Sequence, residues 1–109
     1  MHRIAFRMSV NKGSEAEYEK RHDPIWEELN ETLLEYGVKT YSIFIDDRSG
    51  ELFAYAEVES LEKWQAVADT GVCRKWWRFM GDIMPANEDC SPVSSELREV
   101  FHIENKGLV

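Results

Sequence analysis

Two ring side chains that can exchange protons or hydrogen bonds lie close together in the sequence. Tyr18 and His22 are four residues apart in the stretch YEKRHDPIWEEL, so a helix would place both rings on one face. The same stripe continues with apolar residues only, namely Ile25, Leu29 and Leu33. A stripe of this kind faces the interior of a protein. The two rings are therefore predicted to begin an apolar face, where an imidazole with an ordinary pKa of about 6.5 can act as acid and as base.

Pro24 follows His22 by two residues and is predicted to interrupt this helix. Proline removes a backbone donor and clashes with the preceding turn, so the helix should kink or restart beside His22 and open space next to the imidazole. The alternative is that His22 only satisfies a backbone group at the helix break, because structural histidines outnumber catalytic ones. His2 and His102 have no informative neighbours and are interpreted as structural.

Three further aromatic residues are candidates for a ligand-binding surface. Trp76 and Trp77 are adjacent in CRKWWRFM, and neighbouring residues of a helix diverge by about 100°, so at least one is predicted to line an edge or a pocket. Tyr41 shares a strand face with Ile43 and Ile45, and its hydroxyl needs a partner if it is buried. Taken singly, each of these rings is more often a packing residue than a binding one.

Composition and spacing exclude several other functions. The formal net charge of −8 argues against a nucleic acid partner, whose phosphates require clustered cations. The sequence has no metal-ligand spacing and no glycine-rich phosphate loop, so we expect no metal and no cofactor. No apolar run approaches the roughly 18 residues of a membrane span, and the first residues lack an export pattern. With two cysteines expected as free thiols, the sequence predicts a cytoplasmic protein without membrane partners.

Hydrophobic periodicity predicts four strands and three helical segments. Period-two alternation predicts strands at residues 4–10, 39–45 and 51–58, the last two joined as a hairpin by the turn DDRSG. A helix is predicted from about residue 14 to Gly37, its C-cap. Two more helices are predicted at 61–67, capped by Ser60, and at 72–83. The stretch PANEDCSP is typical of a loop, and the β-prone residues 97–103 are predicted as the fourth strand.

This order, β-α-β-β-α-β, predicts an α+β protein with the ferredoxin-like fold, an antiparallel sheet with helices on one face. We expect one domain at residues 1–104 and a C-terminal tail at 105–109. The third strand carries large residues on both faces, since Phe53 and Tyr55 alternate with Leu52 and Ala54. The second sheet face therefore also needs a cover, and a symmetric homodimer is the simplest one.

These residues together resemble a known family, the L-rhamnose mutarotases. The similarity covers nearly the whole chain to about residue 102 and rests on YEKRHDPIW, YSIFID and VCRKWWRFMGDIMPANEDCSPVSSELREVF. The resemblance implies that His22 is the proton-donating histidine. It further implies that the sugar is contacted by Tyr18, Tyr41, Trp76 and Trp77. It also implies a homodimeric α+β barrel, in agreement with the uncovered sheet face.

The activity implied by the resemblance is the interconversion of the α and β anomers of L-rhamnose or related free sugars. Removing the proton of the anomeric hydroxyl while protonating the ring oxygen opens the ring, and the aldehyde recloses on either face. An isomerase of this kind needs only its sugar substrate. Two alternatives share the fold: a dimeric ferredoxin-like monooxygenase, and a non-catalytic module that binds a small ligand.

Overall fold

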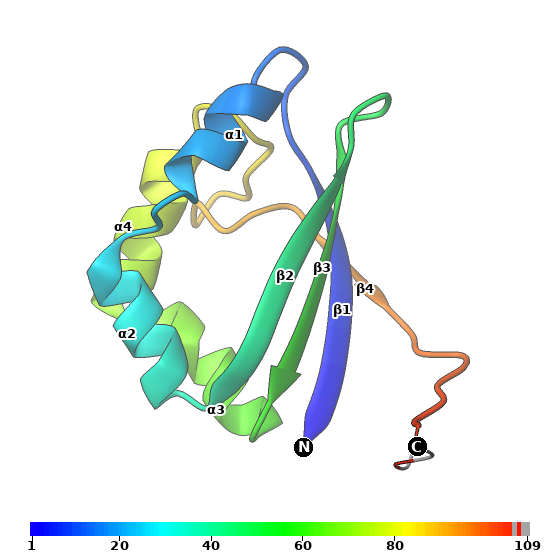
Figure 1. The fold of residues 1–109 in the computed structure, drawn as a ribbon. Helices are drawn as coiled ribbons and strands as arrows, with labels where there is room; N and C mark the ends of the chain where they lie inside the picture. Colours follow the sequence, from blue (N-terminus) through cyan, green and yellow to red (C-terminus); the bar gives the residue numbers. More distant parts are fainter. Residues whose placement is uncertain (106, 108–109) are drawn as a thin grey trace.

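Four antiparallel strands form one sheet in the order β2-β3-β1-β4, and the helices lie together on one side of it (Figure 1). The computed structural model describes residues 1–105 and Gly107. The strands are β1 (His2–Ser9), β2 (Val38–Asp46), β3 (Glu51–Val58) and β4 (Ser95–Leu97). The helices are α1 (Glu15–Arg21), α2 (Glu27–Glu35), α3 (Leu61–Ala66), the 3-10 turn η1 (Val67–Asp69) and α4 (Gly71–Met80). This is the predicted ferredoxin-like α+β arrangement.

The face of the sheet toward the helices, here called the inner face, carries the core. Successive strand residues point to opposite faces, and the registers Phe6↔Ala54 and Ile43↔Ala54 align the apolar set of each strand. Leu52 and Val58 are fully buried on this face. The inner face comprises Ile4, Phe6, Met8, Tyr41, Ile43, Ile45, Leu52, Ala54, Ala56 and Val58. It forms one wall of the space in which the candidate site lies.

The opposite face of the sheet, here called the outer face, has no helix packed on it among the described residues (Figure 1). It comprises Ala5, Arg7, Ser42, Phe44, Phe53 and Tyr55. Phe44 is 65% exposed, and Phe53 and Tyr55 are only partly buried. The sequence-based expectation of a second, uncovered apolar face is met by this surface.

The helix predicted from residue 14 to Gly37 is two helices with a break at residues 22–26. His22 is the C-cap of α1, and its backbone N–H donates to the Glu19 carbonyl at 3.1 Å. The helix restarts at Glu27, so the predicted restart beside Pro24 is confirmed. Gly37 follows the C-cap of α2 with φ +88°, a left-handed conformation that favours glycine.

The second helical region begins at two side-chain caps, of which the one at Ser60 was predicted. Ser60 Oγ accepts from the Lys63 backbone N–H at 3.2 Å and caps α3. Thr70 Oγ1 accepts from the Cys73 backbone N–H at 3.3 Å and caps α4, after the short turn η1. A side-chain cap satisfies a donor that has no partner inside the helix. The cap at Thr70 fixes the start of the helix that carries both candidate tryptophans.

The fourth strand was predicted at residues 97–103, and this prediction is wrong. Only Ser95–Leu97 pairs, antiparallel to β1, and the chain then leaves the sheet. β-propensity expresses how well a side chain fits a half-buried pleated surface, and beyond Leu97 this chain offers the segment no such surface. We call residues 98–105 the C-terminal arm. Three of its side chains are 77–78% exposed, namely Val100, Phe101 and Ile103.

Two other expectations concern the domain boundary and membrane spans. Residues 106, 108 and 109 of the predicted tail at 105–109 lie outside the described residues, so the division after residue 104 stays a prediction. Among the helices that the structure describes, none combines the length and apolar character that crossing a bilayer requires.

Candidate active site

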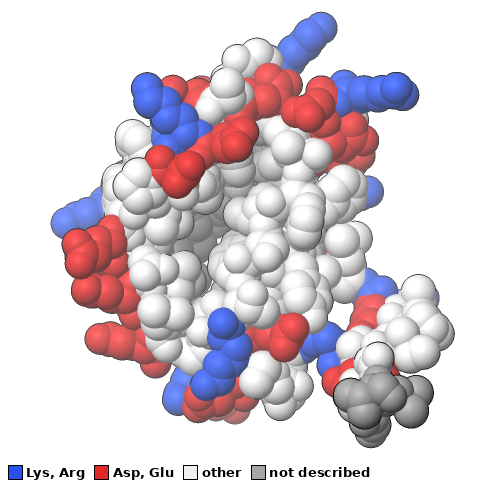
Figure 2. All heavy atoms as spheres, viewed as in Figure 1, with Lys and Arg blue, Asp and Glu red and all other residues white. Residues whose placement is uncertain are grey.

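A cavity of about 1290 Å³ lies between the inner face and the helices. Figure 2 shows it as a hollow with mostly uncharged walls, while the acidic and basic side chains gather around its rim. Such a volume is ample for a small ligand. All five residues predicted for the site contribute to its lining: Tyr18, His22, Tyr41, Trp76 and Trp77.

The imidazole of His22 is oriented by a backbone carbonyl. Its Nδ1 lies 2.7 Å from the carbonyl oxygen of Tyr18, one helical turn earlier. A carbonyl oxygen can only accept, so Nδ1 carries the proton and Nε2 of the neutral ring has the lone pair. Burial lowers the pKa of His22 below 6.5, an effect that the Tyr18 carbonyl partly offsets. The resting ring is therefore neutral at neutral pH, with Nε2 able to accept a proton.

Aromatic neighbours hold this ring from two directions. The ring of Tyr18 stacks on the imidazole with centroids 4.4 Å apart, and Trp76 meets it edge-on at 5.2 Å. Trp76 is in turn packed edge-on against Trp26 at 5.0 Å and lies 5.7 Å from Phe79. Because α1 supplies Tyr18, the break before α2 supplies Trp26 and α4 supplies the other two rings, the helix interface fixes the position of His22.

The hydroxyls of Tyr18 and Tyr41 are protonated hydrogen-bond donors at the cavity. Burial raises the pKa of Tyr18 to about 12. Burial also raises the pKa of Tyr41, with smaller contributions from the nearby Tyr18 and Cys73. Within the described residues neither hydroxyl has a hydrogen-bond partner, and neither is sealed from solvent. Water or a ligand in the cavity is thus the natural partner of both groups.

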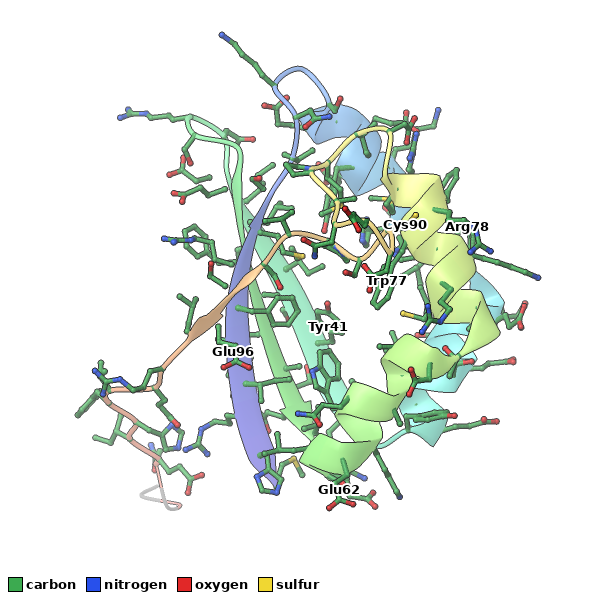
Figure 3. All side chains as sticks on the ribbon, turned by 180° about the vertical axis from the view of Figure 1, so that it is seen from behind. Tyr41, Glu62, Trp77, Arg78, Cys90 and Glu96 are labelled. Atoms are coloured by element: carbon green, nitrogen blue, oxygen red, sulfur yellow. The ribbon has the colours of Figure 1, made fainter. Side chains whose placement is uncertain are left out.

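The two adjacent tryptophans have different surroundings. Trp76 is buried in the aromatic cluster around His22, whereas Trp77 is only partly buried. Both reach the cavity wall, so the prediction that at least one lines a pocket is confirmed. Figure 3 shows Tyr41 on the sheet side and Trp77 on α4, on opposite sides of the space between the two layers.

Sequence reasoning missed part of the cavity wall. Trp64 of α3 lies 5.5 Å from Tyr41 and 6.1 Å from Phe6, measured between ring centroids. Period-two spacing predicted Phe6 as a core residue, and helical spacing predicted the same for Trp64. No other sequence signal indicated that these two rings line the cavity. Asn87 and Ser91 also line the cavity, and the Asn87 amide donates to Ser91 Oγ at 3.1 Å. They belong to the predicted loop PANEDCSP, but no sequence pattern indicated that this loop lies at the cavity.

Arg21 was also missed, and it ties the helix carrying His22 to the end of α4. Its guanidinium donates to Glu17 at 2.8 Å, to Asp82 at 2.9 Å and to the Phe79 carbonyl at 2.8 Å. It also lies 4.3 Å from the centroid of the Phe79 ring. The two carboxylates raise the pKa of Arg21, and its side chain is 11% exposed. We call this set of contacts the Arg21 clamp.

The other titratable groups of the described residues form no second candidate active site or metal site. Among the residues that the structure describes, no three His, Cys, Asp or Glu side chains are grouped to hold a metal ion. Cys73 and Cys90 are free thiols, and burial raises the pKa of Cys73 to about 11. The fold and the site together define a ferredoxin-like α+β protein in which a neutral imidazole, protonated tyrosines and indole surfaces line one cavity.

Comparison with known proteins identifies the family. The family model described as L-rhamnose mutarotase matches residues 3–103. A protein named L-rhamnose mutarotase from Opitutus terrae is 55% identical and covers 95% of this chain and 100% of its own length. A crystal structure of an L-rhamnose mutarotase from Formosa agariphila is 45% identical, with a TM-score of 0.87, over 95% of this chain and 100% of that one. This chain belongs to the L-rhamnose mutarotase family, which confirms the predicted function and the isomerase class.

More distant structures share the fold alone. A dimeric ferredoxin-like protein from an uncultured marine organism has a TM-score of 0.66 at 14% identity, over 95% of this chain and 98% of its own. An antibiotic biosynthesis monooxygenase has a TM-score of 0.61 at 11% identity, over 92% and 99%. The predicted ferredoxin-like class is confirmed. At such identities the monooxygenase similarity carries no activity across, because one fold hosts many functions.

Proposed function

We propose that this protein interconverts the α and β anomers of L-rhamnose through acid–base-catalysed opening and closing of the sugar ring, with His22 as the catalytic residue. The observation that carries the proposal is the 2.7 Å contact between His22 Nδ1 and the Tyr18 carbonyl. It leaves Nε2 of a partly buried, neutral imidazole as the proton acceptor in a cavity whose walls are mostly uncharged. Family membership supports the choice of the sugar.

In the proposed reaction His22 first acts as a base. Nε2 takes the proton of the anomeric hydroxyl, the bond between the anomeric carbon and the ring oxygen breaks, and the ring oxygen gains a proton. The result is the open aldehyde, which rotates about the bond to the next carbon. Closure reverses the steps on either face, with the protonated Nε2 now acting as the acid. A single imidazole near neutrality can serve both directions and contributes typically 10²- to 10⁴-fold in rate.

In this proposal one of the two tyrosine hydroxyls donates the proton that the ring oxygen gains. Tyr18 and Tyr41 both keep their protons at neutral pH because burial raises their pKa. Both hydroxyls lie at the cavity without a partner in the described residues, so they can donate to the ring oxygen or to sugar hydroxyls. Trp76 and Trp77 provide flat apolar surfaces for the C–H face and the methyl group of the sugar. The mechanism needs no metal and no cofactor.

We further propose that the protein works as a homodimer in the cytoplasm, as one domain at residues 1–104. The support for the dimer is the outer face, which exposes Phe44 and part of Phe53 and Tyr55. Joining the outer faces of two copies by a twofold axis would bury these rings and give the α+β barrel. The two free thiols, Cys73 and Cys90, are consistent with a reducing compartment.

The test is saturation-transfer NMR on the anomeric protons of L-rhamnose. We expect the wild-type protein to accelerate exchange, and His22→Asn to lose about 10²- to 10⁴-fold in kcat while its circular dichroism spectrum stays native. Asn keeps a polar group but cannot take up a proton near neutral pH. The matched control is His102→Asn, which removes an exposed histidine that lies beside Glu99 and Glu104.

Three results of this experiment separate the hypotheses. Wild-type rates from His22→Asn would refute the catalytic assignment. A change confined to KM would make His22 a binding residue. Sugar binding by the wild-type protein without faster anomer exchange would instead support the non-catalytic binding module.

A further inference from the structure

The cavity is larger than a single monosaccharide requires. Its volume is about 1290 Å³, whereas pockets that bind drug-sized ligands usually enclose roughly 300–1,000 Å³. A free monosaccharide such as L-rhamnose is considerably smaller than a drug-sized ligand. One pyranose ring beside His22 would therefore leave the more distant part of the cavity to water or to another group.

Tyr41 stands between two parts of this cavity. Tyr18 and Cys73 both contribute to the raised pKa of Tyr41, so they lie near its hydroxyl, on the side of α1 and α4. On the other side the Tyr41 ring packs edge-on against Trp64 of α3, with centroids 5.5 Å apart. The buried core is divided in the same way. Tyr41 packs against both hydrophobic clusters, whereas Trp64 packs only against the smaller one, on β2 and β3.

The part of the cavity beyond Tyr41, here called the α3 subsite, has an aromatic wall. Trp64 and Phe6 both line the cavity and are only partly buried, so part of each ring is open to it. Flat aromatic faces of this kind suit the C–H face of a pyranose ring. The α3 subsite comprises Phe6 of β1, Asn30 and Leu33 of α2, Trp64 and Gln65 of α3, and Ala68 of η1.

Two side-chain amides accompany these rings. Asn30 and Gln65 are exposed and line the cavity, and within the described residues neither carboxamide has a hydrogen-bond partner. Asn30 lies three residues before Leu33, on the same face of α2, and Leu33 packs against the same buried cluster as Trp64. Each amide offers donors and an acceptor to sugar hydroxyls. A flat apolar face beside uncharged hydrogen-bonding groups complements a pyranose ring, which has a C–H face and a rim of hydroxyls.

We propose that the α3 subsite binds a second sugar ring, and that the protein also interconverts the anomers of disaccharides whose reducing end is L-rhamnose. This inference rests on the mutarotation by His22 proposed above and extends it to a larger class of substrates. The reaction is the same: the bond between the anomeric carbon and the ring oxygen breaks and forms again, with the same proton transfers, and the glycosidic bond stays intact.

The shape of the sugar suits this arrangement. Proton transfer involves only the anomeric hydroxyl and the ring oxygen, and the 4-hydroxyl lies across the ring from the anomeric carbon. A glycosyl group on the 4-hydroxyl therefore leaves the reacting atoms free. With the anomeric carbon at His22, the second ring extends away from the imidazole, past Tyr41 and toward Trp64.

The test compares two substrates by saturation-transfer NMR on the anomeric protons: L-rhamnose, and L-rhamnose with a β-D-glucopyranosyl group on its 4-hydroxyl. We expect the wild-type protein to accelerate exchange at the reducing end of the disaccharide with a similar kcat and a lower KM. Contacts at the α3 subsite are the same in the ground state and the transition state, so they lower KM alone. Faster exchange of L-rhamnose without faster exchange of the disaccharide would overturn the subsite and leave the proposed function standing. No acceleration of either sugar would overturn both.

The double variant Asn30→Ala/Gln65→Ala tests where the second ring lies. A neutral hydrogen bond contributes roughly 2- to 10-fold to affinity, so KM for the disaccharide should rise about 10-fold, while kcat and KM for L-rhamnose stay unchanged. The matched control is Glu31→Ala/Glu62→Ala, which changes exposed residues of the same two helices that do not line the cavity. We expect the control to leave both substrates unaffected. An unchanged KM for the disaccharide in Asn30→Ala/Gln65→Ala would overturn the proposal, because the second ring would then lie outside the α3 subsite.

Discussion

Replacing Arg21 by Met would test whether the Arg21 clamp positions the catalytic helix. Methionine keeps an apolar stem of similar length but removes every donor of the guanidinium. The variant loses the contacts to Glu17, Asp82 and the Phe79 carbonyl, and also the cation that lies over the Phe79 ring. The contacts to Asp82 and Phe79 join α1, a helix of only seven residues, to the end of α4.

The expected loss of stability follows from the surroundings of these groups. A hydrogen bond from a charged donor contributes about 1.5–3 kcal/mol and a cation–π contact about 0.5–1 kcal/mol. The carboxylates of Glu17 and Asp82 are 44% and 65% exposed, so water can replace much of what they lose. We therefore expect a loss of about 2 kcal/mol in the free energy of unfolding, or about 8 °C in Tm for a domain of this size.

The assay combines thermal unfolding with anomer-exchange kinetics. As α1 loosens, Tyr18 and His22 are held less well, so kcat should fall about 3- to 30-fold even far below Tm. The control is Arg74→Met, since Arg74 makes one long contact of 3.5 Å to Asp69 and both are exposed; it should change stability by less than about 0.5 kcal/mol. Equal effects of the two substitutions, or an unchanged kcat in Arg21→Met, would refute the positioning role. Arg21→Lys should restore part of kcat.

Three further predictions concern residues that line the cavity. Trp77→Phe and Trp76→Phe should each weaken L-rhamnose binding about 3- to 10-fold in NMR titrations, while the circular dichroism spectrum stays native. Unchanged affinity in both variants would mean that the two tryptophans serve packing and not binding. Burial lowers the pKa of His22, so kcat/KM should rise with pH through a midpoint below 6.5 and then reach a plateau. A midpoint above 6.5 would contradict the assignment of His22 as the initial base. The lowered pKa also makes stability depend on pH. The contribution of His22 to folding is complete above about pH 6.5 and is lost as pH falls through the pKa of His22 in the folded protein. Denaturant titrations of His22→Asn should therefore show a smaller loss of stability on acidification than those of the wild type.

Local patterns were sufficient for most of the fold. Alternation placed β3 at Glu51–Val58 because both faces of that strand have a clear period of two. Pro24 predicted the restart between α1 and α2 because its effect on the backbone is independent of context. Gly37 was placed after α2 for a similar reason, since the left-handed backbone that ends a helix, here with φ +88°, favours glycine. In each case the deciding interaction lies within a few residues of the chain.

The errors arose where the deciding interaction is distant. Val100 and Phe101 have strand propensity, but a strand needs a neighbour, and its presence depends on how the sheet edge is built. Arg21 looks like one more surface arginine in the sequence, and only the packing of α1 against α4 brings Asp82 to it. The Tyr18–His22 spacing, in contrast, predicted a shared face correctly. It did not predict that the break would turn the imidazole back to the Tyr18 carbonyl.

That carbonyl has an evolutionary consequence. Many histidines in active sites depend on a carboxylate to set the tautomer, and one mutation can remove such a partner. In this protein the partner of His22 Nδ1 is main-chain oxygen, which every amino acid at position 18 would still supply. Substitutions at position 18 can change the ring that stacks on the imidazole and so alter the affinity of the site for ligands. The tautomer of His22 stays the same, because the helical backbone sets it. Substrate preference in such a site can diverge without the proton chemistry having to be rebuilt.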